Sequence, residues 1–348
     1  ICGISILSSK SETFGASGAT SVTSGISLSG LSGTINVVTG SSGGAGQSGG
    51  IFVSAGSSQI EVGGDVSVTG GVSTSEDGSS IQFKLGEGTA SSSGDFTLQS
   101  AAAGASASSG QIEVKSGVAA STNSGSLSMA VGLSSSGSTS SFEISAGASR
   151  SSSIGGSIKI NAGQSTVSSG GAIVARSGAG VTASSGRVVA STSSSGNFGT
   201  SGATILSTGQ SSDSASGDIS ATVGSLTSGT NAGEIQFQAG NGQTGSNVLL
   251  GGGASNAAAG GDIQIASGLI SDSATGSSGI ISVSTPNGGA GGSGEVSFSS
   301  GQSVGGKSGA ISVKTSNAPI QAGDIVIKTS DSALTSGTIS LTSGASNL

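Results

Sequence analysis

A short apolar motif that recurs about every 15 residues constrains the fold of this 348-residue chain more than any other feature. The motif is Gly-x-Φ-x-Φ, where Φ is apolar, as in "GGSIKINAG" at 155–163 and "GGDIQIASG" at 260–268. It fits 23 times from Ile4 to Ile339, so 22 steps span 335 positions and the mean period is near 15.2. The second Φ is apolar in all 23 units, the first in 21, and glycine stands two places before the first in 19. A disordered Gly/Ser-rich linker does not need to keep such a phase.

Apolar residues two places apart and bounded by glycines are typical of short β-strands between tight turns. No segment shows a sustained 3.6-residue period, and glycine at this density disfavours helix. The sequence therefore predicts an all-β protein, a β-solenoid (parallel β-helix) of about 23 coils with a ~15-residue period. Adjacent coils are expected to stack at about 4.8 Å.

A 15-residue unit could form a whole coil or half of a 30-residue coil, and we favour the whole coil. The residue two places after the second Φ is usually small, as at Ala55 and Ala146, and serine often follows three places later, as at Ser58 and Ser165. Small side chains in this phase suit the far wall of a narrow core. The expected core ladder is represented by Ile35, Val37, Ile158, Ile160, Ile263 and Ile265.

The repeat runs through residues 1–348, which predicts one continuous solenoid domain without capping segments. The chain has no initiator Met and no signal-peptide pattern, so we expect a mature product or a segment of a longer protein. Strand edges at uncapped ends would be unpaired, which predicts end-to-end self-association.

The composition argues against enzymes and against several kinds of partner. There is no His and a single Cys, Cys2, so neither a Ser-His-Asp triad nor a zinc cluster is expected, and we expect no cofactor. Cys2 could be a free thiol or pair with a neighbouring chain. The net charge of −7 disfavours nucleic acid, and no apolar run approaches the ~18 residues of a membrane span. Acidic residues often precede the first Φ. They indicate a solvated surface that blocks lateral aggregation or, alternatively, an acidic calcium-binding stripe.

Three successive units carry an apolar residue between the two Φ positions, where the side chain should point outward. These residues are Val174, Val189 and Ile205. They predict an exposed apolar ladder, which is a candidate lateral interface between two molecules. Two alternatives remain: β-propensity alone, and a local exchange of faces, because Ala175 and Ala190 are small for inward positions.

The phrases "SGDISATVG", "GGDIQIASG" and "SGTISLTSG" resemble Ser/Gly-rich repeats in cell-surface proteins of diatoms and related microalgae. They are more distantly similar to bacterial filamentous adhesins of the haemagglutinin type. The resemblance implies an extracellular or cell-surface fibre of a wall, matrix or adhesive, and it carries over no functional residues. The alternative is a surface-binding module for ice, mineral or polysaccharide, although the outward positions are mixed, as Phe52 and Lys159 show.

Overall fold

The computed structural model describes most of the chain as two units, Ile1–Ala162 and Gly163–Leu348. The described residues are 4–8, 17–44, 46–88, 92–120, 123–135, 137–150, 153–212, 215–226, 232–257, 259–270, 277–289 and 291–344. Cys2 lies outside these ranges. The repeat runs through both units, and the expectation of a single domain over 1–348 stays a prediction.

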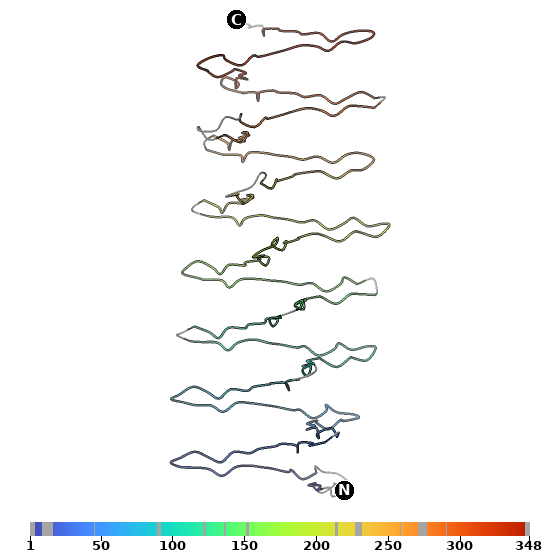
Figure 1. The fold of residues 1–348 in the computed structure, drawn as a ribbon, viewed down its shortest axis with the longest axis vertical. Coiled ribbons are helices and arrows are strands. Elements are labelled where there is room, and N and C mark those ends of the chain that lie inside the picture. Colours follow the sequence, from blue (N-terminus) through green and yellow to red (C-terminus); the bar gives the residue numbers. More distant parts are fainter. Residues whose placement is uncertain are drawn as a thin grey trace. The chain divides into compact units, whose positions relative to one another are not determined.

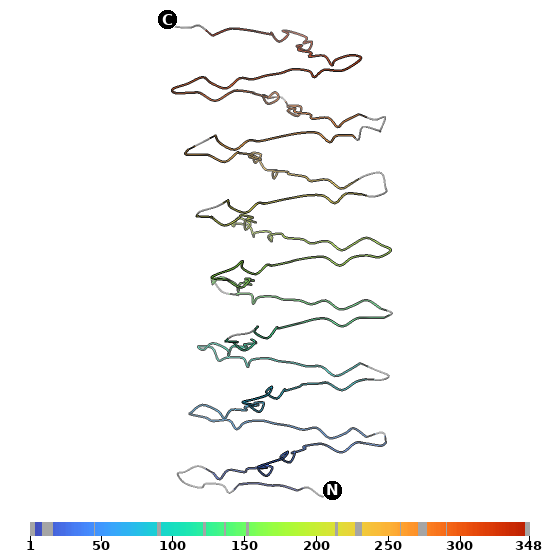
Figure 2. The ribbon, with the colours of Figure 1, turned by 90° about the vertical axis from the view of Figure 1, so that its left-hand side faces the viewer.

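Within each unit the ribbon consists of extended stretches joined by loops that turn the chain back (Figures 1 and 2). The described residues form no helix and no strand, so there are no element bounds to give. The prediction of an all-β solenoid with about 23 stacked coils is therefore wrong for this structure. A sheet needs backbone hydrogen bonds repeated along two neighbouring segments. Here the recurring bonds occur at the loops instead.

The recurring element is a loop whose two ends are joined by one backbone hydrogen bond. The N–H of Gly64 donates to the carbonyl of Gly56 at 2.9 Å, and Gly156 donates to Gly147 at the same distance. Further pairs are Gly71–Ser79, Gly86–Gly94, Gly163–Gly171, Gly178–Gly186, Gly253–Gly261 and Gly268–Gly279. The acceptor lies three places after a second Φ, and the donor lies two places before the next first Φ. We call each such segment a closed loop; its length and joined ends are those of a compact surface loop.

The segments on the two sides of a closed loop run in opposite directions. At the loop Gly86–Gly94, a Cβ placed on Gly94 would lie 3.9 Å from Cβ of Leu85. Two places further from the loop, the rings of Phe83 and Phe96 have centroids 6.2 Å apart. Moving away from the loop, residue numbers fall by two on one segment and rise by two on the other. The two segments are therefore paired antiparallel. A 15-residue unit that formed a full coil would make consecutive segments run the same way, so the preferred whole-coil interpretation fails here.

Serine side chains stabilise the closed loops. Ser58 Oγ accepts a hydrogen bond from the N–H of Glu61 at 3.0 Å, and Ser165 Oγ accepts one from Ser168 at 2.9 Å. The same contact occurs at Ser27, Ser73, Ser134 and Ser303. Each serine lies two places after the glycine position that begins the loop. Ser58 and Ser165 thus bind loop backbone and do not line the wall of a core, because a serine hydroxyl competes well for turn N–H groups.

Replacing Gly156 by alanine should weaken the closed loop Gly147–Gly156. An added Cβ would lie 3.2 Å from both Ala146 Cβ and Gly147 N, which is tighter than ordinary contact. Gly147→Ala is the matched control, since an added Cβ there meets nothing within 4 Å. We expect the amide of residue 156 to exchange hydrogen roughly fivefold faster in Gly156→Ala alone, as for the loss of about 1 kcal/mol. Hydrogen exchange followed by NMR measures this, and equal effects of the two variants would contradict the register.

Replacing Ser165 by alanine should free the two backbone N–H groups that donate hydrogen bonds to its hydroxyl. Ser165 Oγ lies 2.9 Å from Ser168 N and 3.4 Å from Val167 N. We expect the amide of Ser168 to exchange roughly threefold to tenfold faster, because a net hydrogen bond of about 1 kcal/mol is lost. Ser169→Ala, in the same loop, is the control and should leave that rate unchanged.

Candidate assembly surface

The extended segments have two distinct faces. Lys115 Nζ donates to Glu113 Oε1 at 3.0 Å, and these residues follow the second and the first Φ of one unit. Residues in these two positions therefore lie on the same side of the segment, opposite the Φ pair, as alternation along an extended chain requires. We call the side that carries the Φ residues the inner face and the other side the outer face.

The inner face is only partly covered. The six residues expected to form a core ladder, Ile35, Val37, Ile158, Ile160, Ile263 and Ile265, are between 51% and 70% exposed. No side chain is buried anywhere in the part of the chain that the structure describes. The core ladder is thus corrected to a row of half-exposed side chains. The physical reason is that one facing segment covers only one side of each Φ pair.

The contact that does cover the inner face is made across a closed loop. Phe83, the second Φ of one unit, faces Phe96, the first Φ of the next, with their rings tilted by 41°. By the same register Val53 faces Val66 across the loop Gly56–Gly64, and Ile144 faces Ile158 across Gly147–Gly156. Each closed loop therefore brings together apolar residues of two successive repeats and leaves their remaining surface open.

Two successive loops determine which residues of the expected lateral interface lie opposite each other. The bond from Gly186 N–H to the Gly178 carbonyl, 2.9 Å long, sets Val174 opposite Val189. At the next turn, a Cβ on Gly202 would lie 3.5 Å from Thr192 Cγ2, a register that sets Val189 opposite Ile205. The three side chains are 75%, 63% and 82% exposed in chain order. The register therefore puts all three in one row that alternates with the Φ residues; the assignment of this row to the outer face and its role as an interface stay predictions.

Two arginines beside this row were missed by the sequence reasoning. Arg176 lies two places before Gly178, and Arg187 lies one place after Gly186, so the register sets them opposite each other on the outer face with Val174 and Val189. The chain has three arginines, and the register sets two of them opposite each other here. The signal was present in the sequence, but it is visible only if successive units are paired antiparallel about the loop.

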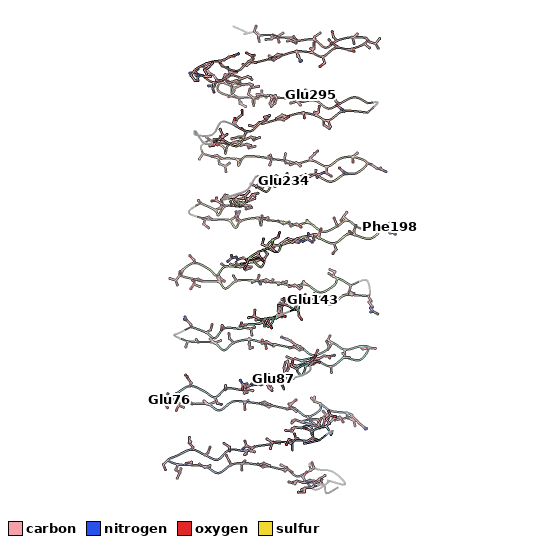
Figure 3. All side chains as sticks on the ribbon, viewed as in Figure 1. Glu76, Glu87, Glu143, Phe198, Glu234 and Glu295 are labelled. Atoms are coloured by element: carbon pink, nitrogen blue, oxygen red, sulfur yellow. The ribbon has the colours of Figure 1, made fainter. Side chains whose placement is uncertain are left out.

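Other chemistry that could define a site does not appear in the described residues. They contain no group of three metal-ligating side chains and no pocket. Acidic residues occur both at loop tips and on extended segments: Figure 3 shows Glu76 at a loop tip, and Glu234 and Glu295 along extended segments. Among the residues searched, no helix is long and apolar enough to cross a membrane.

Comparison with known proteins gives no relative. No protein-family model, no curated protein and no solved structure matches this chain.

Replacing Val174, Val189 and Ile205 together by serine should weaken association between molecules, because only outer-face apolar area is lost. We expect the protein concentration at which light scattering rises to increase about threefold or more. The control removes three apolar side chains that are more exposed and lie at loop tips, in Val167→Ser/Val181→Ser/Phe198→Ser, and should have little effect. If the triple outer-face variant instead loses the slow exchange of the Gly186 amide, these side chains hold the loop itself and the interface assignment is wrong.

Proposed function

We propose that this protein is an extracellular structural protein whose copies associate into a fibre or filament of a cell wall, matrix or adhesive. The observation that carries this proposal is the repetition of uncovered apolar surface. A motif present 23 times puts two apolar side chains on the inner face of 21 units and one on that of the other two, and none is buried in the described part of the chain. Folded monomers rarely leave so many of their large apolar side chains open to water.

Repetition makes weak contacts effective. One half-exposed Φ pair offers little binding energy, but once two molecules touch at one repeat, neighbouring repeats of the same molecules are held at high effective concentration. A regular spacing near 15 residues keeps successive contacts in phase. The repeat is therefore suited to side-by-side association of many copies.

Association through segment faces replaces end-to-end stacking as the favoured mode. End-to-end stacking rested on unpaired strand edges, and the described residues contain no strand. The acidic balance, with a net charge of −7, keeps single chains soluble until contacts accumulate. A polysaccharide or mineral surface in the matrix is a compatible further partner, because the loops offer many exposed hydroxyls.

The proposal is tested on the purified chain over a range of protein concentrations. We expect a concentration-dependent increase in sedimenting material, with elongated particles in negative-stain electron microscopy. A chain that stays monomeric across the soluble range and shows thermal hysteresis or ice shaping would instead be a surface-binding module.

A further inference from the structure

The outer face of the closed loop Gly178–Gly186 combines two positive charges with two apolar side chains. Arg176 lies opposite Arg187, and Val174 lies opposite Val189, one step further from the loop. Like charges directly opposite each other repel. A pair of guanidinium groups in this arrangement gains from an added carboxylate, which can bind both through charge-assisted hydrogen bonds.

No other closed loop of the described residues carries two like charges at these positions. Lys84, the counterpart of Arg176, lies opposite Asp95 across the loop Gly86–Gly94. Thr69 lies opposite Ser80 across Gly71–Ser79. The arginine pair therefore stands out among the closed loops as a concentrated positive charge in a chain of net charge −7.

Two other closed loops carry the complementary combination. In the loop Gly253–Gly261, Leu249 and Asp262 hold the motif positions that Val174 and Arg187 hold in the arginine loop. In the loop Gly56–Gly64, the same two positions carry Phe52 and Asp65. Phe52 and Leu249 are 94% and 92% exposed. Each of these loops thus presents one carboxylate and one large apolar side chain on its outer face.

None of these charges is neutralised by an ion pair in the described part of the chain. The ion pair found there joins Lys115 to Glu113, and Arg176, Arg187, Asp65 and Asp262 take no part in it. Their charges are exposed to solvent and available to a partner.

We propose that the arginine loop of one molecule binds an acidic loop, at Asp262 or at Asp65, of a second copy of this chain. The carboxylate would lie between Arg176 and Arg187, and Leu249 or Phe52 would pack on Val174 and Val189. This proposal rests on the self-association proposed above and names the surfaces that produce it.

The contact joins two different surfaces, so each copy that binds through its arginine loop still has free acidic loops. Heterologous contacts of this kind propagate into open filaments unless the geometry closes a ring. A chain with both surfaces therefore needs no other component to extend a fibre. The charges would also set which repeats of two molecules align, since rows of similar apolar pairs do not distinguish one register from another.

The test uses two charge-reversed chains. One carries Arg176→Glu/Arg187→Glu and the other carries Asp65→Lys/Asp262→Lys. Each reversal turns attraction into repulsion, so we expect each chain alone to need about a tenfold higher concentration to sediment than the unmodified protein at low ionic strength. In an equimolar mixture every contact between the two different variants joins opposite charges, so alternating copies can assemble and we expect sedimentation to return to the unmodified level.

The matched control is Lys84→Glu/Lys314→Glu, which changes the net charge as much as the arginine reversal does. Lys84 and Lys314 are already opposite Asp95 and Asp324 in the register of their own chain, and their reversal should have a much smaller effect. Equal losses in the control and in the arginine variant would show a net-charge effect and overturn the proposal.

The remaining outcomes separate this inference from the proposed function. If the unmodified chain assembles and the arginine variant assembles equally well, the arginine contact is wrong and the fibre proposal stands. If the unmodified chain does not assemble at all, both are wrong. If the arginine variant assembles normally but loses binding to dextran sulfate, the arginine pair recognises an acidic polysaccharide, and the contact between copies is overturned.

Discussion

The backbone hydrogen bond between the two motif glycines is the interaction on which the rest of the structure depends. At Gly56–Gly64 and Gly147–Gly156 it measures 2.9 Å, and it fixes where the chain reverses. Once the reversal is fixed, the alternation of side chains along each extended segment decides which side chains of successive repeats face each other. The glycine at the donor end is required by space: at Gly156 an added Cβ would crowd Ala146 and the backbone of Gly147. The serine that follows the first glycine then satisfies the N–H groups inside the loop.

This architecture leaves the chain with local order and open surfaces. Each closed loop holds its neighbouring segments by one exposed bond, which contributes on the order of 1 kcal/mol, and by one apolar contact such as Phe83 with Phe96. Neither is enough to bury a side chain in the described residues. The same features that limit the stability of a single molecule supply repeated surfaces to other molecules. Weak internal cohesion and the proposed self-association would thus be two consequences of one repeat.

In the proposed contact between copies, the charges would give direction to that association. Most of the repeat offers similar apolar pairs, so many alignments of two molecules would be nearly equal in energy. Arg176 and Arg187 on one loop, and Asp262 beside Leu249 on another, distinguish one alignment from the rest. Exposed ion pairs contribute little singly, but they contribute most to selecting among otherwise equivalent arrangements. A chain with few charges needs only a few charged positions to select one alignment, because most of its other residues are neutral Ser and Gly.

The sequence by itself determined the unit length, the phase of the glycines, and the assignment of Ile158 and Ile160 to one face and Val174 to the other, because alternation along an extended segment is a local property. It did not determine whether successive segments run parallel as coils or reverse at each loop, since both arrangements place the Φ residues on one side. The preference for a whole coil and the expectation of Ser165 as a core wall followed from the parallel choice. The solenoid and its buried ladder at Ile35 and Ile263 also required a sheet, which the described residues do not form. Only the tertiary structure decided it, through the bond from Gly186 to Gly178 and its counterparts. Which residues oppose each other depends on the direction of the paired segments, and so the placement of Arg176 opposite Arg187 became visible only there.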